Sequence, residues 1–396
     1  MDRFRPAGRG VFSATLSSYV MMALYAVLLN MFGEILPSII EDFGITLSKA
    51  GLLQTSFNIG GMATLAALIF FSDRVRKSRL VYFSFIIIAT ILVLTGLFAR
   101  SYILLTVAYI MLGSTTKVFD VSVNIYINDI NTSGREFFLQ VLHVCFGIGA
   151  VLGPLFGAVI VGTALGWKSA FLVLGGVCLA MVMISFITLF RPSDAFESGG
   201  PEKHSGGMKI AQLLKEPQVW VLTFGSMCFS GSYVALVTWF PTYTEALAND
   251  SRKYSGLIIS MYFLGFVLSR ILASFILTQK NARRLILITA FAGSISLLAA
   301  YILGQTWSFF VFFPAAGFFS GATLPIIIFV GCVTFPRNTG GVTSMLCIGG
   351  SLSAMVLPYI IGVIGDSSGI AGAMPLTAYI ILAAAFASFL IKRRDS

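Results

Sequence analysis

Ionisable and amide side chains recur every three or four residues inside apolar segments of this sequence, where charge is otherwise scarce. The apolar segment 103–128 carries Lys117, Asp120, Asn124 and Asn128, at successive spacings of 3, 4 and 4 residues. Residues at these spacings lie on one face of an α-helix. Because a charge inside an apolar segment is unfavourable unless it is paired or reaches water, this polar face is a candidate functional surface.

Three other apolar segments carry polar pairs one helical turn apart. The pairs are Asn30 and Glu34, Gln54 and Asn58, and Gln140 and His143. Polar residues that serve only local packing would show no agreement of phase between segments, whereas these faces all follow the helical repeat. We therefore expect the four segments to line one aqueous cavity, with amide groups that can hydrogen-bond a polar solute.

Glu34 and Asp120 are the carboxylates of these faces. Burial in a partly dry cavity disfavours the charged form of a carboxylate, which lets it take up and release a proton near neutral pH. Two alternatives stay open: Glu34 is a solvated residue at the outer end of its helix, and Asp120 forms a static ion pair with Lys117. Such a pair would keep Asp120 ionised and oppose proton carriage. His143 is either part of the proton path, a donor to the solute, or a packing residue.

In the second half of the chain, aromatic and hydroxyl side chains cluster around Tyr233 and Trp239. They could stack on a polyol and hydrogen-bond to it, although aromatic residues are equally common in packing and at membrane interfaces. Arg270 lies near the C-terminal end of the apolar segment 254–278. We expect its long side chain to extend to the polar surface, a structural role.

The composition shows what surrounds these segments. Of 396 residues, 57% are hydrophobic and only 11% charged, whereas soluble domains carry about 25% charged residues. The solvent for most of the surface must therefore be lipid. The net charge of +10 comes from short runs of cations between apolar segments, so it does not indicate nucleic-acid binding. The five cysteines lie in apolar runs without C-x-x-C spacing, which predicts neither a zinc site nor disulfides, and no cofactor is expected.

Twelve apolar runs reach the roughly 20 residues that a helical span needs. They cover residues 11–37, 47–71, 80–99, 103–128, 136–163, 168–190, 218–245, 254–278, 284–304, 307–333, 339–364 and 370–391. The Pro- and Gly-containing polar stretch 191–217 separates six runs from six. We predict an all-α polytopic membrane protein with an N-terminal six-helix bundle (1–190), a cytoplasmic linker (191–217) and a C-terminal six-helix bundle (218–396).

The cations also predict the orientation. Nineteen of the 26 Lys and Arg residues fall in the N-terminus, the linker, the C-terminus and the loops on their side, which places these parts in the cytoplasm. An internal repeat relates the halves: FGIGAVLGPLFGAVIVG (146–162) matches CIGGSLSAMVLPYIIGVIG (347–365), with Pro154 opposite Pro358. Pseudo-symmetric halves are typical of transporters with a solute path at the interface of the halves, near the membrane midplane.

The cytoplasmic loop 72–79 reads Ser-Asp-Arg-Val-Arg-Lys-Ser-Arg. It resembles the loop between spans two and three of the major facilitator superfamily, whose pattern is G-x-x-x-D-R/K-x-G-R/K-R/K. Ile69 and Arg76 stand where the family has glycines. The resemblance implies two pseudo-symmetric six-helix bundles over the whole chain. It also implies a gating role for this loop, carried by Asp73, Arg74, Arg76 and Lys77.

Within that superfamily, the stretches FDVSVN (119–124) and LQVLHVCFGIGAVLGPLFG (139–157) resemble the fourth and fifth spans of the fucose–glucose–galactose proton symporters. FGEIL (32–36) resembles their first-span segment with a coupling carboxylate. The likeness implies that Glu34 and Asp120 are the protonatable pair and that Asn124 and His143 lie near the sugar. Lys117 and Tyr233 depart from this pattern, and Lys117 would suit an anionic solute.

These observations predict a secondary transporter that moves a small polar solute, a sugar by resemblance, by proton-coupled symport. The predicted solute contacts are Asn30, Asn58, Lys117, Asn124, Gln140, His143, Tyr233 and Trp239. The alternative is a proton-coupled antiporter that exports drugs or metabolites, since Gly149-x-x-x-Gly153-Pro154-x-x-Gly157 resembles a fifth-span antiporter motif. An enzyme is not expected, because metal triads, G-x-S-x-G and P-loop patterns are missing. We expect a monomer in the cell membrane, driven by protons, with sodium left open.

Overall fold

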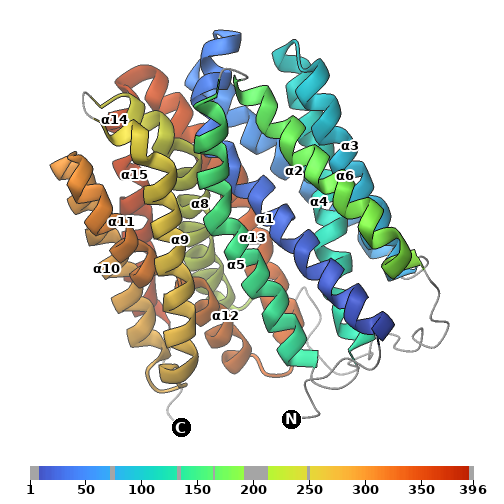
Figure 1. The fold of residues 1–396 in the computed structure, drawn as a ribbon. Helices are drawn as coiled ribbons and strands as arrows, with labels where there is room; N and C mark the ends of the chain where they lie inside the picture. Colours follow the sequence, from blue (N-terminus) through green and yellow to red (C-terminus); the bar gives the residue numbers. More distant parts are fainter. Residues whose placement is uncertain are drawn as a thin grey trace. The chain divides into compact units, whose positions relative to one another are not determined.

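The computed structural model describes residues 9–71, 76–131, 135–163, 166–190, 213–247 and 250–391, and it is helical throughout apart from short turns (Figure 1). The first half contains α1 (Arg9–Phe43), α2 (Leu47–Phe71), α3 (Lys77–Phe98), α4 (Tyr102–Ile130), α5 (Arg135–Val161) and α6 (Gly166–Phe190). The second contains α8 (Pro217–Glu245), α9 (Ser251–Ile276), α10 (Ala282–Leu303), α11 (Thr306–Ser320), α12 (Thr323–Thr334), α13 (Thr339–Ser368), α14 (Ile370–Ala373), α15 (Pro375–Ala387) and a closing 3₁₀ turn (Ser388–Leu390).

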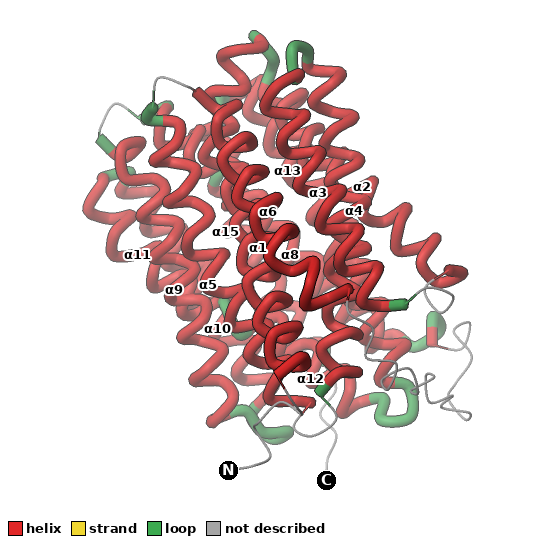
Figure 2. Tube along the Cα trace, turned by 45° about the vertical axis from the view of Figure 1, so that its right-hand side comes forward, coloured by secondary structure: helices red, strands yellow, loops and turns green. Residues whose placement is uncertain are grey.

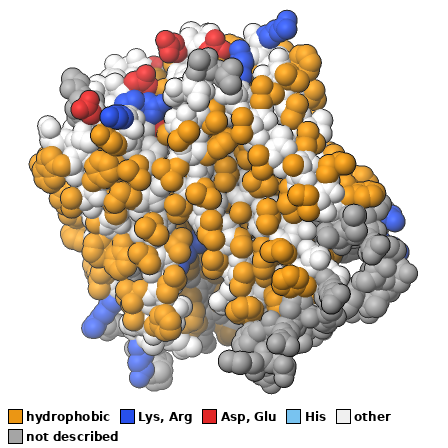
Figure 3. All heavy atoms as spheres, in the orientation of Figure 1, with side chains coloured by type: hydrophobic (Ala, Val, Ile, Leu, Met, Phe, Trp, Pro, Cys, Tyr) orange, Lys and Arg blue, Asp and Glu red, His pale blue; other side chains and the backbone are white. Residues whose placement is uncertain are grey.

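The predicted all-α membrane fold is confirmed. The described residues contain no β-strand, as the tube view shows (Figure 2), and eleven helical segments long and apolar enough to cross a membrane. The remaining predicted span, 47–71, coincides with the 25-residue helix α2, whose side chains from residue 66 onward lie outside the described set. On the face shown in Figure 3, hydrophobic side chains cover the flanks of the helices and most visible charged side chains lie near their ends. The protein is therefore a multi-pass membrane protein.

The chain divides into two compact units, and the division differs from a simple cut in the linker. Unit 1 comprises Met1–Phe43 and Ser56–Glu202, whereas unit 2 comprises Gly44–Thr55 and Lys203–Ser396. In unit 1, α1 packs along α5 and α3 packs along α6; in unit 2, α8 packs along α13 and α9 along α11. The first turns of α2 thus belong by their contacts to the second unit, which the sequence did not predict.

The contacts of Gly44–Thr55 explain this assignment. The Asp366 carboxylate, on α13, accepts hydrogen bonds from the backbone N–H groups of Leu47 (2.7 Å) and Ser48 (3.0 Å) at the start of α2. Two turns further on, the Thr55 hydroxyl donates to the carbonyl of Met355 at 2.7 Å. A carboxylate at a helix N-terminus satisfies N–H groups that have no partner within the helix and complements the helix dipole.

Three glycines let α1 and α5 approach closely. A Cβ atom at Gly149 would lie 2.7 Å from the Cβ of Ala26, and one at Gly153 would lie 2.9 Å from the Cβ of Asn30. One turn further, a Cβ at Gly157 would lie 2.8 Å from the Cβ of Glu34. Small residues spaced by four form a flat stripe along which a second membrane helix can pack. Close packing of α1 against α5 is therefore enough to explain why Gly149, Gly153 and Gly157 are glycines.

The tenth span is broken in the middle, between α11 and α12. Pro325, near the start of α12, lacks a backbone N–H and its ring clashes with a helical carbonyl four residues earlier, which here is Gly321. The chain therefore leaves the helix at Gly321–Ala322, and the Ala322 N–H bonds instead to the hydroxyl of Ser269 on α9 at 3.1 Å. The break leaves the carbonyl of Gly321 available to a donor outside its own helix.

Candidate functional site

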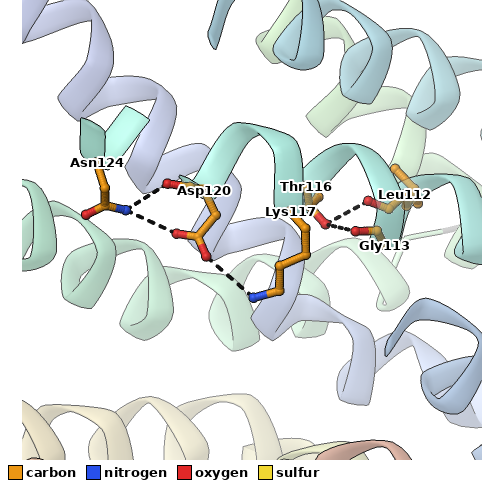
Figure 4. Close-up of polar contacts among 6 residues, drawn as sticks. All are labelled: Leu112, Gly113, Thr116, Lys117, Asp120 and Asn124. Carbon is orange, nitrogen blue, oxygen red and sulfur yellow. Dashed lines mark hydrogen bonds and ion pairs between the residues drawn. The ribbon is translucent and has the colours of Figure 1, made fainter. Parts of the chain in front are cut away.

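The predicted polar face of α4 forms a connected network (Figure 4). The Lys117 ammonium lies 3.4 Å from Oδ2 of Asp120. The side-chain amide of Asn124 donates to the Asp120 carbonyl at 2.8 Å and to Oδ1 of the same residue at 3.3 Å. Lys117 and Asp120 are 32% and 29% exposed. The pair is therefore held in place by its neighbours yet open on one side to a solute or to water.

The neighbouring helix α2 leaves room for the Lys117 side chain. A Cβ atom at Gly61 would lie 2.9 Å from Cγ of Lys117, and the Ser114 hydroxyl donates to the Gly60 carbonyl at 3.1 Å. Asn58 precedes Gly61 by one turn and is half-buried. Since residues one turn apart share a helix face, Asn58 and the α4 network lie on facing sides of the α2–α4 contact.

Glu34 and Asn30 lie in the α1–α5 interface rather than on an open polar face. Glu34 is 1% exposed and packs against Gly157; Asn30 is 4% exposed and donates its amide N–H to the carbonyl of Ala26 at 2.8 Å. The alternative of a solvated Glu34 at the outer end of its helix is therefore wrong for this conformation. In this conformation neither group is open to a solute or to water.

The remaining predicted contact residues of unit 1 are accessible. Gln140 and His143 are both exposed on α5. The structure describes only two of the four predicted gating residues. Arg76 directly precedes α3 and Lys77 is its first residue, while Asp73 and Arg74 lie outside the described residues. Their gating role stays a prediction.

In unit 2, the two predicted aromatic contacts differ in their surroundings. Tyr233 is half-buried and stacks on Phe229, with ring centroids 6.3 Å apart, and on Phe266 at 5.7 Å. Trp239 is fully buried, and its indole N–H donates to the carbonyl of Pro358 at 2.9 Å. Trp239 therefore tethers α8 to α13 and presents no surface to a solute in this structure, unlike the contact predicted for it.

We expect Trp239→Phe to lower the free energy of unfolding by about 1 kcal/mol, because it removes a buried hydrogen bond and part of a packed ring. Solute affinity should stay unchanged. Circular dichroism melts in detergent, together with a solute-binding titration, check both statements. Trp220→Phe is the matched control, since Trp220 also donates to a carbonyl, that of Leu214, but is exposed. Weakened solute affinity with unaltered stability would contradict the packing role.

Arg270, for which we expected an extended position at the end of α9, points the other way. Its guanidinium carbon lies 4.4 Å from the ring centroid of Phe266, one turn back along the helix. Its Nε–H donates to the Gly321 carbonyl at 3.3 Å, at the break of the tenth span. The sequence did contain a signal, because Pro325 follows Gly321 by four residues and leaves that carbonyl without its helical donor.

The comparisons with known proteins agree with this architecture. A family model described as "Major Facilitator Superfamily" matches residues 12–251. A bacterial homologue of the human lysosomal transporter Spinster, solved in an inward-facing and unoccupied conformation, superposes with a TM-score of 0.81 at 15% identity, covering 97% of each chain. At that identity the likeness concerns the fold.

Two curated relatives cover most of the chain. "Protein TsgA homolog" of Buchnera aphidicola is 22% identical over 365 residues, covering 91% of this chain and 90% of its own. "Probable sulfoacetate transporter SauU" of Cupriavidus necator is 24% identical over 363 residues, covering 84% and 82%. With the family model matched over more than half of its length, this membrane protein belongs to the Major Facilitator Superfamily and is a transporter of a small-molecule substrate.

Proposed function

We propose that the protein moves a small polar solute across the cell membrane by proton-coupled symport, as a monomer with both termini in the cytoplasm. The observation that carries this proposal is the half-exposed Lys117–Asp120–Asn124 network inside the span α4. Charged groups within a span are unfavourable unless they are paired or face water; this pair also keeps about a third of each side chain exposed, and a carboxylate that water reaches can exchange a proton. The orientation rests on the distribution of Lys and Arg.

Asp120 and Glu34 differ in their exposure to water, so we assign their proton exchange to two different steps of one transport cycle. Asp120 is partly exposed beside Lys117, so a solute that hydrogen-bonds Lys117 or Asn124 competes directly with the ion pair. Protonation of Asp120 would release Lys117 in the same way. Glu34 is enclosed between α1 and α5, so its proton exchange requires a conformation in which these helices separate. Alternating access would thereby alternate the exposure of a protonatable group.

The sugar class is the first candidate for the solute. It rests on the residues of α4 and α5, where Asn124, Gln140 and His143 offer hydrogen bonds. The relatives named above do not carry sugar in their names.

A second candidate is a small organic anion. Lys117 supplies a cation that a neutral sugar does not require, and one relative is named for sulfoacetate, a doubly acidic small molecule. Sugar acids would satisfy both candidates, because they combine hydroxyl groups with a carboxylate.

Export of lipophilic compounds has less support. The glycines of the antiporter-like motif are used in the contact of α1 with α5, so their presence has a sufficient packing explanation.

Proton movement in proteoliposomes tests the proposal. A pH dye outside vesicles would report alkalinisation when the transported solute is added, and hexoses, deoxyhexoses and sugar acids form the panel. Vesicles without protein and vesicles with a proton ionophore are the controls. Acidification outside on loading a lipophilic cation would instead establish antiport. Solute uptake that is driven by a sodium gradient, with no proton movement, would show that sodium and not the proton is the coupling ion.

A further inference from the structure

The Arg270 guanidinium lies beside the break of the tenth span. Gly321, whose carbonyl accepts its Nε–H, stands near the middle of the apolar segment Thr306–Thr334. The Phe266 ring under the guanidinium lies one turn further from the C-terminal end of α9. The side chain therefore directs its charge into the span, at the place where the tenth span is broken.

Arg270 forms no ion pair within the described part of the chain. There, ion pairs join Lys117 with Asp120, Lys168 with Asp42, and Arg252 with Glu245. A guanidinium has five N–H donors, and Nε uses one of them for Gly321. The contact with the Gly321 carbonyl takes one N–H donor and does not require a positively charged side chain. Beyond the Phe266 ring under the guanidinium, no acidic side chain in the described residues pairs with the charge of Arg270, and four of its N–H groups remain for a further acceptor.

The exposed head of Arg270 faces away from lipid. The exposed large apolar residues of α9 gather toward one side of the helix and are Leu257, Leu264, Leu268, Ile271, Leu272, Phe275 and Ile276. At 3.6 residues per turn, Arg270 lies about 150° around the helix from their mean direction. Phe263 and Phe266 share its side of α9, and both contact the ring of Tyr233 on α8. Since Arg270 is exposed on a face that lipid does not cover, water reaches its guanidinium.

The surroundings fix the guanidinium in one orientation. The Gly321 carbonyl accepts from its Nε and the Phe266 ring supports its face, which leaves the two Nη groups for a further acceptor. Helix α12 begins two residues after Gly321, without a side-chain cap. The positive end of this half-helix therefore lies at the same break. A planar pair of N–H groups with added positive potential matches the two oxygens of a carboxylate or sulfonate.

We infer that Arg270 is an anion-binding residue that takes the carboxylate or sulfonate group of a small organic acid, the solute of this transporter. The inference rests on the proposed function and deepens it by naming the chemical class of the substrate. Phe266 and Tyr233 form an apolar wall beside the guanidinium, which suits the carbon skeleton of the acid.

Thermal unfolding of the purified protein in detergent measures this binding without transport. The probes are two acid–neutral pairs at fixed chloride concentration: galacturonate with galactose, and 2-hydroxyethanesulfonate with ethylene glycol. A ligand that binds only the folded state raises the melting temperature as its concentration rises. We expect stabilisation by at least one acid and none by its neutral partner. The acid should no longer raise the melting temperature of Arg270→Gln. For Arg270→Lys, the same rise in melting temperature should require at least a tenfold higher concentration of the acid.

Arg283→Gln is the matched control. Arg283 also donates to a carbonyl, that of Phe389, at 2.7 Å and lies over the same residue's ring at 6.0 Å, but on the exposed end of α10. It should keep the full acid response. Gln at position 270 retains a donor for Gly321, and an unchanged melting temperature without probe shows that the variant is folded.

Phenylglyoxal provides a readout that needs no correct choice of solute, since it modifies guanidinium groups that water reaches. Mass spectrometry should find Arg270 modified, more slowly when the stabilising acid is present. Each of four results would overturn the inference. They are an unmodified Arg270, equal stabilisation by an acid and its neutral partner, no stabilisation by either acid, and an acid response that survives in Arg270→Gln. Proton-coupled uptake of a neutral sugar by Arg270→Gln at the wild-type rate would overturn it while leaving the proposed function intact. Acid binding without proton movement would support it and refute proton symport.

Discussion

Asp120→Asn should abolish uphill accumulation of the solute, so that the concentration inside proteoliposomes rises only to that outside. Asparagine keeps the size and the hydrogen bonds with Asn124 but cannot exchange a proton, which removes coupling and leaves exchange partly intact. Uptake with and without an imposed pH gradient measures the first effect, and counterflow of labelled solute measures the second.

Helix α1 offers the control for this experiment. Asp42, near its C-terminal end, also forms an ion pair with a lysine, Lys168, at 3.2 Å, so Asp42→Asn makes the same chemical change away from the Lys117 pair. We expect it to accumulate solute as the wild type does. Glu34→Gln should resemble Asp120→Asn. Full uphill transport by both Glu34→Gln and Asp120→Asn would rule out these carboxylates as the coupling groups.

Gly153→Leu is the substitution with the largest expected effect on folding. Its Cβ alone would lie 2.9 Å from Asn30 and 3.0 Å from the carbonyl of Val27, so α1 and α5 would have to move apart. Overpacking of this kind costs about 1–3 kcal/mol, and occasionally more. We expect a lower melting temperature and a smaller yield of folded protein after detergent extraction.

Gly176→Leu separates this effect from the general cost of replacing a helical glycine. A Cβ atom at Gly176, on α6, would meet nothing within 4 Å. Leucine also favours helix over glycine, so this variant should be as stable as the wild type or slightly more so. Equal melting temperatures for Gly153→Leu and Gly176→Leu would contradict the proposed role of the α1–α5 contact.

The extent to which the sequence predicted the site follows from the range of each interaction. Lys117, Asp120 and Asn124 interact within one helix, and helical periodicity alone brings them together. The burial of Glu34 depends on a glycine 123 positions later, at residue 157. Periodicity places Glu34 on a face but does not show which helix covers that face.

Residues in the second half show the same limit. Trp239 was expected at the solute because of its type, yet its partner is the carbonyl of Pro358, 119 residues away. The direction of Arg270 depends on a break 51 residues further on, at Gly321. Length and hydropathy predicted the spans because these are properties of single segments. Contacts between segments needed the structure.

The cap on α2 has a consequence for the time course of biosynthesis. The Leu47 N–H and the Asp366 carboxylate that accepts it are 319 residues apart in the chain. At the usual 5–20 residues per second, the ribosome needs about 15–60 seconds to make the intervening chain. During that interval the start of α2 has no partner for the N–H groups of Leu47 and Ser48 apart from water or the insertion machinery. The start of α2 thus obtains this cap only after nearly the whole of the second half has been synthesised.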